Sequence, residues 1–118
     1  MRTSNVWTYR DTFSDVDRTS DLIGYDVEAT DGGIGKIDKL SAEASRQYVV
    51  VDTGFWIFGK KRLVPAGVIE RVDHADRRVY VSMTKDQIKS APDYDDTRAS
   101  YSDEDYDRYG TYYNDYGW

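Results

Sequence analysis

Short β-rich runs separated by turn residues fill the middle of this chain, from residue 21 to about residue 83. An Asp-Gly-Gly turn at 31–33 separates the runs at 24–29 and 34–40, and its glycines tolerate the positive φ that a tight hairpin requires. The run Tyr-Val-Val-Val at 48–51 is continuous and β-branched, as in a strand buried on both faces. About six short strands with close turns predict a small antiparallel β-barrel, in which closure removes the exposed edges.

A helix start signal follows the last of these runs. Thr84 and Gln87 have the spacing of a capping box, in which each side chain bonds the backbone N–H group of the other residue. The residue before a proline disfavours the helical region, so the helix should stop before Pro92. We therefore predict a mainly β fold, with a small barrel at 21–83 and a short helix at about 85–90 that closes one end.

Charge is unevenly spread along the 118 residues. The net charge is −6, and the whole acidic excess lies in residues 93–118, together with 7 of the 11 tyrosines. That segment holds no Val, Ile, Leu or Met, so it cannot build an aliphatic core of its own. We predict a flexible acidic tail with weak helicity around 102–109, since Gly110 costs ~1 kcal/mol within a helix. Residues 1–20 form a polar N-terminal arm, whose aromatic side chains are expected to dock on the barrel domain at 21–92.

Several stretches of the chain resemble the PRC-barrel domain in their order and spacing. They are residues 21–27 and 31–38 at its opening, 51–54, 57–61 and 63–66 at its centre, and 79–81, 84–89 and 91–92 at its exit. The resemblance covers roughly residues 21–95 and is to the stand-alone bacterial form, which is often linked to stress responses. It implies a compact β-barrel that serves as an interaction module, and it brings no catalytic residues and no cofactor. One relative is a ribosome-maturation factor, which implies an alternative role as an RNA- or ribosome-associated binding module.

Composition excludes several classes of site. Cysteine is absent and histidine occurs once, which removes disulfides, thiolate metal sites and histidine-rich metal sites. The single histidine, His74, lies in a turn, where a surface histidine is expected rather than a ligand or a base. No nucleophile–base pair stands out, so we expect a protein that is not an enzyme. No apolar run approaches the ~20 residues of a membrane span and no secretory leader core is present, so a cytoplasmic protein is expected.

A cluster of large apolar residues between Gly54 and Gly59 is the strongest candidate for an interaction surface. Four such side chains cannot all point inward from one short loop, and exposed aromatic clusters mark binding surfaces. The cationic residues that follow would form a rim for an acidic partner. The predicted surface consists of Phe55, Trp56, Ile57, Phe58, Lys60, Lys61 and Arg62. It predicts a homo-oligomer or an adaptor for another protein. In the alternative, the loop folds over a barrel end as core, and the basic residues are a solvated edge.

Nucleic acid is not expected as a partner from charge alone. Residues 1–92 hold 14 basic and 14 acidic residues, and the acidic tail repels phosphate. The RNA-associated alternative gains weight if the available cations share one face of the fold. Those cations are Lys60, Lys61, Arg62, Arg71, Arg77 and Arg78.

An acidic stretch after the barrel has the spacing of a calcium loop. The residues at the first, third, fifth and twelfth positions of that loop are Asp93, Asp95, Thr97 and Glu104. Arg98 stands at the sixth position, where the sharp turn requires glycine, so a solvated acidic linker is favoured over weak calcium binding. Binding of a small ligand stays open, without a pocket signature in the sequence.

Overall fold

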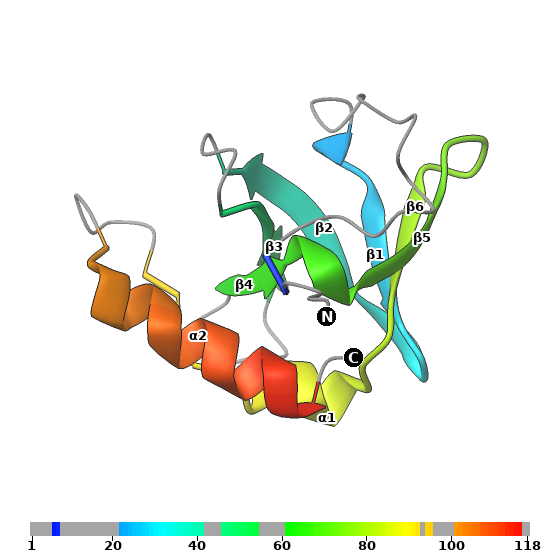
Figure 1. Cartoon of the computed structure of the whole chain (residues 1–118). Helices are drawn as coiled ribbons and strands as arrows, with labels where there is room; N and C mark the ends of the chain where they lie inside the picture. Colours follow the sequence, from blue (N-terminus) through cyan, green and yellow to red (C-terminus); the bar gives the residue numbers. More distant parts are fainter. Residues whose placement is uncertain are drawn as a thin grey trace, which may run out of the picture.

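Six strands form a single sheet in the order β4-β3-β2-β1-β6-β5 (Figure 1). The computed structural model describes residues 6–7, 22–41, 46–54, 61–92, 94–95 and 101–116. The strands are β1 (Asp26–Ala29), β2 (Gly32–Leu40), β3 (Tyr48–Asp52), β4 (Lys61–Pro65), β5 (Ile69–Asp73) and β6 (Arg78–Val81). A single 3-10 turn, η3 (Ala66–Val68), carries the chain from β4 at one edge of the sheet to β5 at the other. The sheet is therefore barrel-like, although β4 and β5 are not paired with each other within the described residues.

The predicted mainly β fold is confirmed, with one difference in strand direction. β1 and β6 run parallel, with Val27 opposite Val79, whereas the other four strand pairs are antiparallel. The tight turn after β5 fixes β6 antiparallel to β5, and this hairpin then lies along β1, whose direction is set much earlier in the chain. The sheet is consequently mixed rather than wholly antiparallel.

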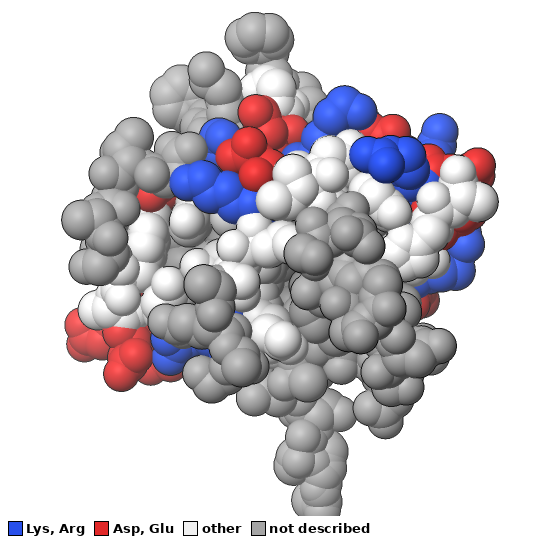
Figure 2. Space-filling view, turned by 90° about the horizontal axis from the view of Figure 1, so that it is seen from above, with Lys and Arg blue, Asp and Glu red and all other residues white. Residues whose placement is uncertain are grey.

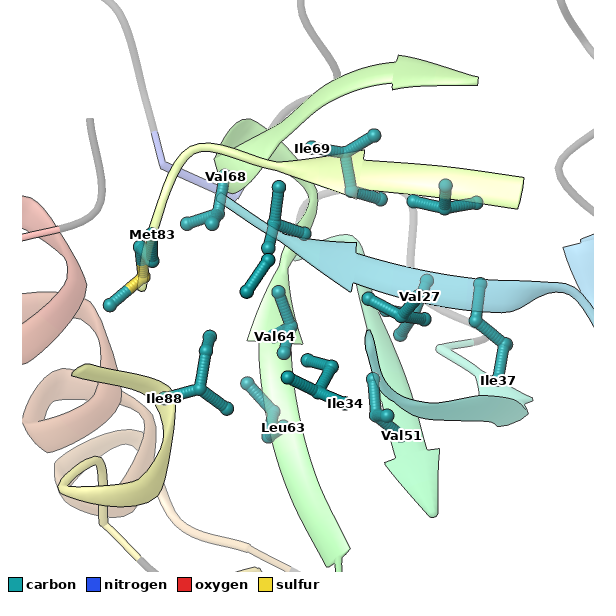
Figure 3. Packing of buried hydrophobic residues seen from close by; sticks show 14 of the residues in the cluster. Val27, Ile34, Ile37, Val51, Leu63, Val64, Val68, Ile69, Met83 and Ile88 are labelled. Atoms are coloured by element: carbon teal, nitrogen blue, oxygen red, sulfur yellow. The ribbon is translucent and has the colours of Figure 1, made fainter. Parts of the chain in front are cut away.

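The core lies on the enclosed side of the sheet, where side chains from all six strands meet (Figure 3). The residues labelled there are Val27, Ile34, Ile37, Val51, Leu63, Val64, Val68, Ile69, Met83 and Ile88. Each is at most 2 % exposed. Burial of this apolar surface, at roughly 25 cal/mol per Å², is the main term that favours the fold.

Helix α1 (Lys85–Lys89) lies at one end of the barrel, as predicted (Figure 1). The capping box is confirmed, because Thr84 Oγ1 accepts from the Gln87 N–H at 3.1 Å and Gln87 Oε1 accepts from the Thr84 N–H at 2.9 Å. Asp31, in the β1–β2 turn, accepts from the Lys85 N–H at 2.8 Å. The turn and the helix start are thus fixed to each other, and Ile88 points into the core.

Helix α2 (Asp103–Tyr116) replaces the flexible tail that the sequence predicts. Its 14 residues pack against the barrel, with Tyr109 and Tyr113 both 0 % exposed. The missing aliphatic side chains are replaced by tyrosine rings, each of which buries a large apolar area. Ser102 and Asp105 start the helix, since Asp105 Oδ2 accepts from the Ser102 N–H at 2.8 Å and Ser102 Oγ accepts from the Asp105 N–H at 3.2 Å. No helix in the described part of the chain has the length and apolar character needed to cross a bilayer.

Gly35 lies where β2 passes against the end of β3. Its φ is +149°, and a Cβ atom there would overlap the carbonyl oxygen of Asp52 and lie 2.9 Å from its carbonyl carbon. Both the backbone conformation and the close approach therefore require glycine.

Candidate functional site

Only two residues of the predicted interaction surface belong to the described chain. The residues outside it are Phe55, Trp56, Ile57, Phe58 and Lys60. Lys61 Nζ lies 2.7 Å from Asp38 Oδ2 and 3.9 Å from Asp52 Oδ2. Its charge is thus shared with carboxylates of β3, the neighbouring strand, and of β2, the strand beyond β3.

Arg62 is a structural residue, which corrects its predicted place in an exposed cationic rim. It is 3 % exposed, and it donates from Nε to the Ile88 carbonyl at 3.2 Å and from Nη2 to the Lys89 carbonyl at 2.9 Å. The last carbonyls of a helix lack intrahelical partners, and a cation there also complements the helix dipole. Arg62 therefore fixes the end of α1 to β4, a contact between distant residues that the local Lys-Lys-Arg pattern does not indicate.

The described residues hold no group of three or more His, Asp or Glu that could bind a metal ion. Asp93 and Thr97 lie outside those residues. The backbone of Asp95 is bonded to the Tyr101 hydroxyl, which accepts from its N–H at 2.8 Å and donates to its carbonyl at 2.7 Å. Glu104 is exposed in the first turn of α2, where negative charge complements the helix dipole. The calcium loop stays a prediction.

Trp7, Tyr48 and Tyr106 form a contact between the N-terminal arm, β3 and α2, here called the aromatic joint. The Trp7 ring centroid lies 6.0 Å from that of Tyr48 and 5.9 Å from that of Tyr106, and the two tyrosine hydroxyls are 3.3 Å apart. The arm is also held by its backbone, because the Val6 carbonyl accepts from the Gly67 N–H at 2.7 Å. Trp7 thus docks on the barrel, as expected of the aromatic side chains of the arm.

Gly110 has a specific role in this joint. A Cβ atom at that position would lie 3.2 Å from Trp7 Nε1. Glycine weakens the helix by ~1 kcal/mol relative to alanine, yet it leaves the space that the indole ring occupies. The residue that makes α2 a weak helix in isolation is therefore the one that admits Trp7.

Tyr109 and Tyr113, one turn apart, anchor α2 on the barrel. Burial raises the pKa of both phenols above their ordinary range. The Tyr113 hydroxyl is buried without a hydrogen-bond partner in the described part of the chain. An unsatisfied group of this kind costs roughly 1–3 kcal/mol. The Tyr113 ring therefore favours docking of α2, whereas its hydroxyl opposes it.

Raising the pH above about 10 is expected to lower the free energy of unfolding. Tyrosines of the unfolded chain ionise near that pH, whereas the raised pKa values keep Tyr109 and Tyr113 protonated in the folded chain. Their contribution is fully present below pH ~10 and is lost as the pH rises further. Urea unfolding from about pH 8 to about pH 11 measures the effect in the wild type and in Tyr113→Phe, which cannot ionise at that position. Above pH 10, the free energy of unfolding of the variant should rise relative to that of the wild type by up to ~1.4 kcal/mol per pH unit. Equal pH dependence of the two proteins would contradict the burial of this phenol.

The outer face of the sheet carries charges of alternating sign on neighbouring strands. One cross-strand row runs from Lys36 through Asp26 and Arg78 to Asp73. Lys36 Nζ lies 2.7 Å from Asp26 Oδ1, and Arg78 Nη1 lies 3.2 Å from Glu28 Oε2. Seen from above, basic and acidic side chains are accordingly interspersed (Figure 2). This face offers paired charges rather than a continuous basic track.

The cations considered for RNA binding fall into two groups at opposite edges of the sheet. Lys61 and Arg62 belong to β4, whereas Arg71, Arg77 and Arg78 belong to the β5–β6 hairpin and its turn. The arginines of the hairpin are exposed. The two cations of β4 are less accessible to a ligand, because Lys61 is ion-paired and Arg62 is buried.

Tyr25, His74 and Arg77 lie together where this hairpin turns, and they are here called the hairpin-end cluster. The Tyr25 hydroxyl is 2.8 Å from His74 Nδ1, and the Arg77 guanidinium carbon lies 5.1 Å from the centroid of the Tyr25 ring. His74 and Arg77 are exposed, whereas Tyr25 is 4 % exposed. His74 lies on the surface, as expected, but its contact with Tyr25 joins residues far apart in sequence and carries no local signal.

Neither a family model nor a curated protein matches this chain. Among solved structures, it is similar to RimM of Pseudomonas aeruginosa, a protein assigned to 16S ribosomal RNA processing, at 22 % sequence identity and a TM-score of 0.49. The similarity covers 62 % of this chain and 48 % of that chain, so it spans about half the length of the matched protein.

The expectation that nucleic acid is an unlikely partner is corrected. The matched protein is described as acting in ribosomal RNA processing. Most of the negative charge on which the expectation rested is carried by α2, below the sheet, whereas the β5–β6 hairpin lies at the top of the molecule (Figure 1). Net charge alone therefore does not describe what the hairpin presents to a partner.

Proposed function

We propose that this protein is a non-catalytic binding module of the PRC-barrel type that attaches to an RNA-containing particle such as the ribosome. The observation that supports the proposal is a group of three exposed arginines on one hairpin, which also carries Glu70, Asp73 and Asp76 and so has no net positive charge. Arg71, Arg77 and Arg78 are gathered on the β5–β6 hairpin, on the side of the sheet away from acidic α2 (Figure 1).

Screening by salt makes this separation effective. The molecule measures 34 × 32 × 26 Å. At physiological ionic strength, interactions between exposed charges decay over about 8 Å. An RNA phosphate at the hairpin is therefore influenced by the arginines and their neighbours far more than by the carboxylates of α2. Arginine suits this role, since its planar group binds phosphate oxygens through several donors and also stacks on aromatic rings.

Self-association through Phe55–Phe58 and a role in stress responses stay predictions, because that loop lies outside the described residues. A surface for a second protein on that loop is compatible with an RNA contact on the hairpin, since the two belong to different parts of the chain. The experiment below separates them.

Sedimentation in sucrose gradients tests the proposal. Full-length protein is mixed with purified bacterial small ribosomal subunits and, separately, with protein-free 16S ribosomal RNA, at several potassium chloride concentrations. We expect co-sedimentation at low salt and release as salt rises, because phosphate contacts release bound counterions. Protein that stays at the top of both gradients at low salt would overturn the proposal. Sedimentation without RNA at a multiple of the 13.6 kDa mass would instead support self-association.

Two charge-matched variants show whether the hairpin is responsible. One carries Arg71→Gln, Arg77→Gln and Arg78→Gln, and the other carries Lys39→Gln, Lys85→Gln and Lys89→Gln. Both remove three positive charges, so a difference between them reports position rather than net charge. We expect only the arginine variant to lose co-sedimentation, with thermal unfolding measured to verify that both variants fold.

A further inference from the structure

Arg77 holds a backbone conformation that is unfavourable for its side chain. Its φ is +58°, the only positive φ of a non-glycine residue in the described chain. In this left-handed region the Cβ atom crowds the backbone, and glycine is the residue that adopts it freely. The preceding turn is tightened by the Asp76 N–H, which donates to Asp73 Oδ1 at 3.0 Å. A glycine would therefore suit the turn better than an arginine.

The strained conformation places the Arg77 guanidinium at a defined position. The group lies over the Tyr25 ring, and a Cβ atom at Gly24 would be 3.7 Å from its Nη2 atom. The guanidinium thus lies beside the Tyr25 ring and Gly24, and these neighbours reduce the side-chain freedom that is lost when a ligand binds.

Arg77 differs from the other two arginines of the hairpin in its partners. Arg78 is paired with Glu28 at 3.2 Å, and Arg71 lies 3.9 Å from Asp73 Oδ2 and over the Tyr80 ring. Within the described residues, Arg77 is in no ion pair, and its guanidinium lies over the Tyr25 ring. Its donors are therefore available to an external anion.

His74, which also contacts Tyr25, supplies a second hydrogen-bond donor. Its ring stands at 77° to that of Tyr25 with centroids 5.7 Å apart, and Nδ1 is 2.8 Å from the Tyr25 hydroxyl. When that hydroxyl donates to Nδ1, the proton of the neutral imidazole lies on Nε2, which is then a second donor held at Tyr25.

We propose that Arg77 and His74, both held against Tyr25, form an anion-binding site for the phosphate backbone of RNA. This inference rests on the proposed function and assigns it to particular residues. Phosphate contacts position a protein on a nucleic acid without reading its sequence. Binding through this site should therefore depend strongly on the salt concentration and only weakly on the RNA sequence.

Fluorescence anisotropy with a labelled single-stranded oligouridylate tests the site on the full-length protein. The informative pair is Arg77→Gln and Arg78→Gln, neighbours on the same turn that remove the same charge. We expect Arg77→Gln to weaken binding about tenfold and to lower the slope of log affinity against log salt by about one. The control Arg78→Gln should change the affinity by less than about twofold, since Arg78 is already paired with Glu28.

A second variant, Arg77→Gly, guards against a fold defect. It removes the donor and relieves the backbone strain, so thermal unfolding should occur at the same temperature as in the wild type or higher, while RNA binding falls as in Arg77→Gln. Equal loss of binding in Arg77→Gln and Arg78→Gln, or no loss in either, would overturn the site while leaving the proposed function intact. A wild type that binds no RNA would overturn both. Binding of labelled polyglutamate that depends on Arg77, without binding of oligouridylate, would assign the site to an acidic protein segment and contradict the RNA phosphate.

Discussion

Replacing Gly35 with alanine is expected to prevent the barrel from folding, or to destabilise it by more than ~4 kcal/mol. The new Cβ atom would overlap the carbonyl oxygen of Asp52, and Gly35 also has a φ of +149° that side chains disfavour. The obstacle is backbone rather than a flexible side chain, so β2 and β3 would have to separate where they pair. Circular dichroism and urea unfolding measure the loss.

Gly54→Ala is the matched control for this variant. Gly54 also has a positive φ, +69°, but a Cβ atom there meets nothing within 4 Å. Its substitution should cost only the backbone strain, roughly 1 kcal/mol. If Gly35→Ala unfolds within a few degrees of Gly54→Ala, the close approach of β2 to Asp52 is wrong.

The second large effect is expected for Tyr109→Ala, which removes a fully buried ring from α2. Truncation of a buried aromatic side chain to alanine typically costs about 3–5 kcal/mol. Because α2 packs on the outside of an already formed barrel, the helix should be released before the strands unfold. The loss of stability is then limited to the free energy that docking of α2 contributes. Hydrogen exchange resolves this, since amides of Asp103–Tyr116 should lose protection while those of β1–β3 keep it.

Thr111→Ala serves as the control for release of the helix. Thr111 lies on the same helix and is exposed, so its substitution should leave exchange within α2 nearly unchanged. Full protection of α2 in Tyr109→Ala would show that the tyrosine is not an anchor. A second readout is the aromatic joint, because Trp7 contacts Tyr106 and Gly110 and should become more exposed when α2 leaves.

Features set by neighbouring residues were predictable from the sequence, and features set by distant contacts were not. The capping box at Thr84 and the first hairpin turn depend on residues within a few positions. The capping box is found where expected, and the turn lies at 30–31 rather than at the predicted 31–33. The parallel pairing of β1 with β6 joins segments about fifty residues apart, for which the pattern of each strand holds no information on direction.

The C-terminal helix shows the same division within one element. The spacing of Tyr106, Tyr109 and Tyr113 on one face was visible in the sequence, and the rings are indeed partly or fully buried. A weak helix is predicted because of Gly110. In the structure, this glycine leaves room for the indole ring of Trp7. Intrinsic propensity described the isolated helix correctly, and tertiary packing reversed the outcome.

The candidate site was the least predictable part. Charge runs in the sequence pointed to Lys60–Arg62, where Lys61 is ion-paired and Arg62 is buried against α1. Nothing in the sequence distinguishes Arg77 from the other five cations considered for RNA binding. What distinguishes Arg77 is the conformation of one turn and the contact with Tyr25. Neither can be inferred from a count of charges.

The contact of Trp7 with Gly110 also has a consequence for quality control. The whole barrel separates Trp7 along the chain from the helix that covers it. A chain in which α2 is undocked or cleaved off therefore displays an uncovered indole ring, together with the barrel surface that Tyr109 and Tyr113 bury. Such exposed apolar surface is what chaperones and proteases bind. Docking of α2 is thus the event that hides this surface, and it gives chaperones and proteases a direct means of telling chains with a docked helix from chains without one.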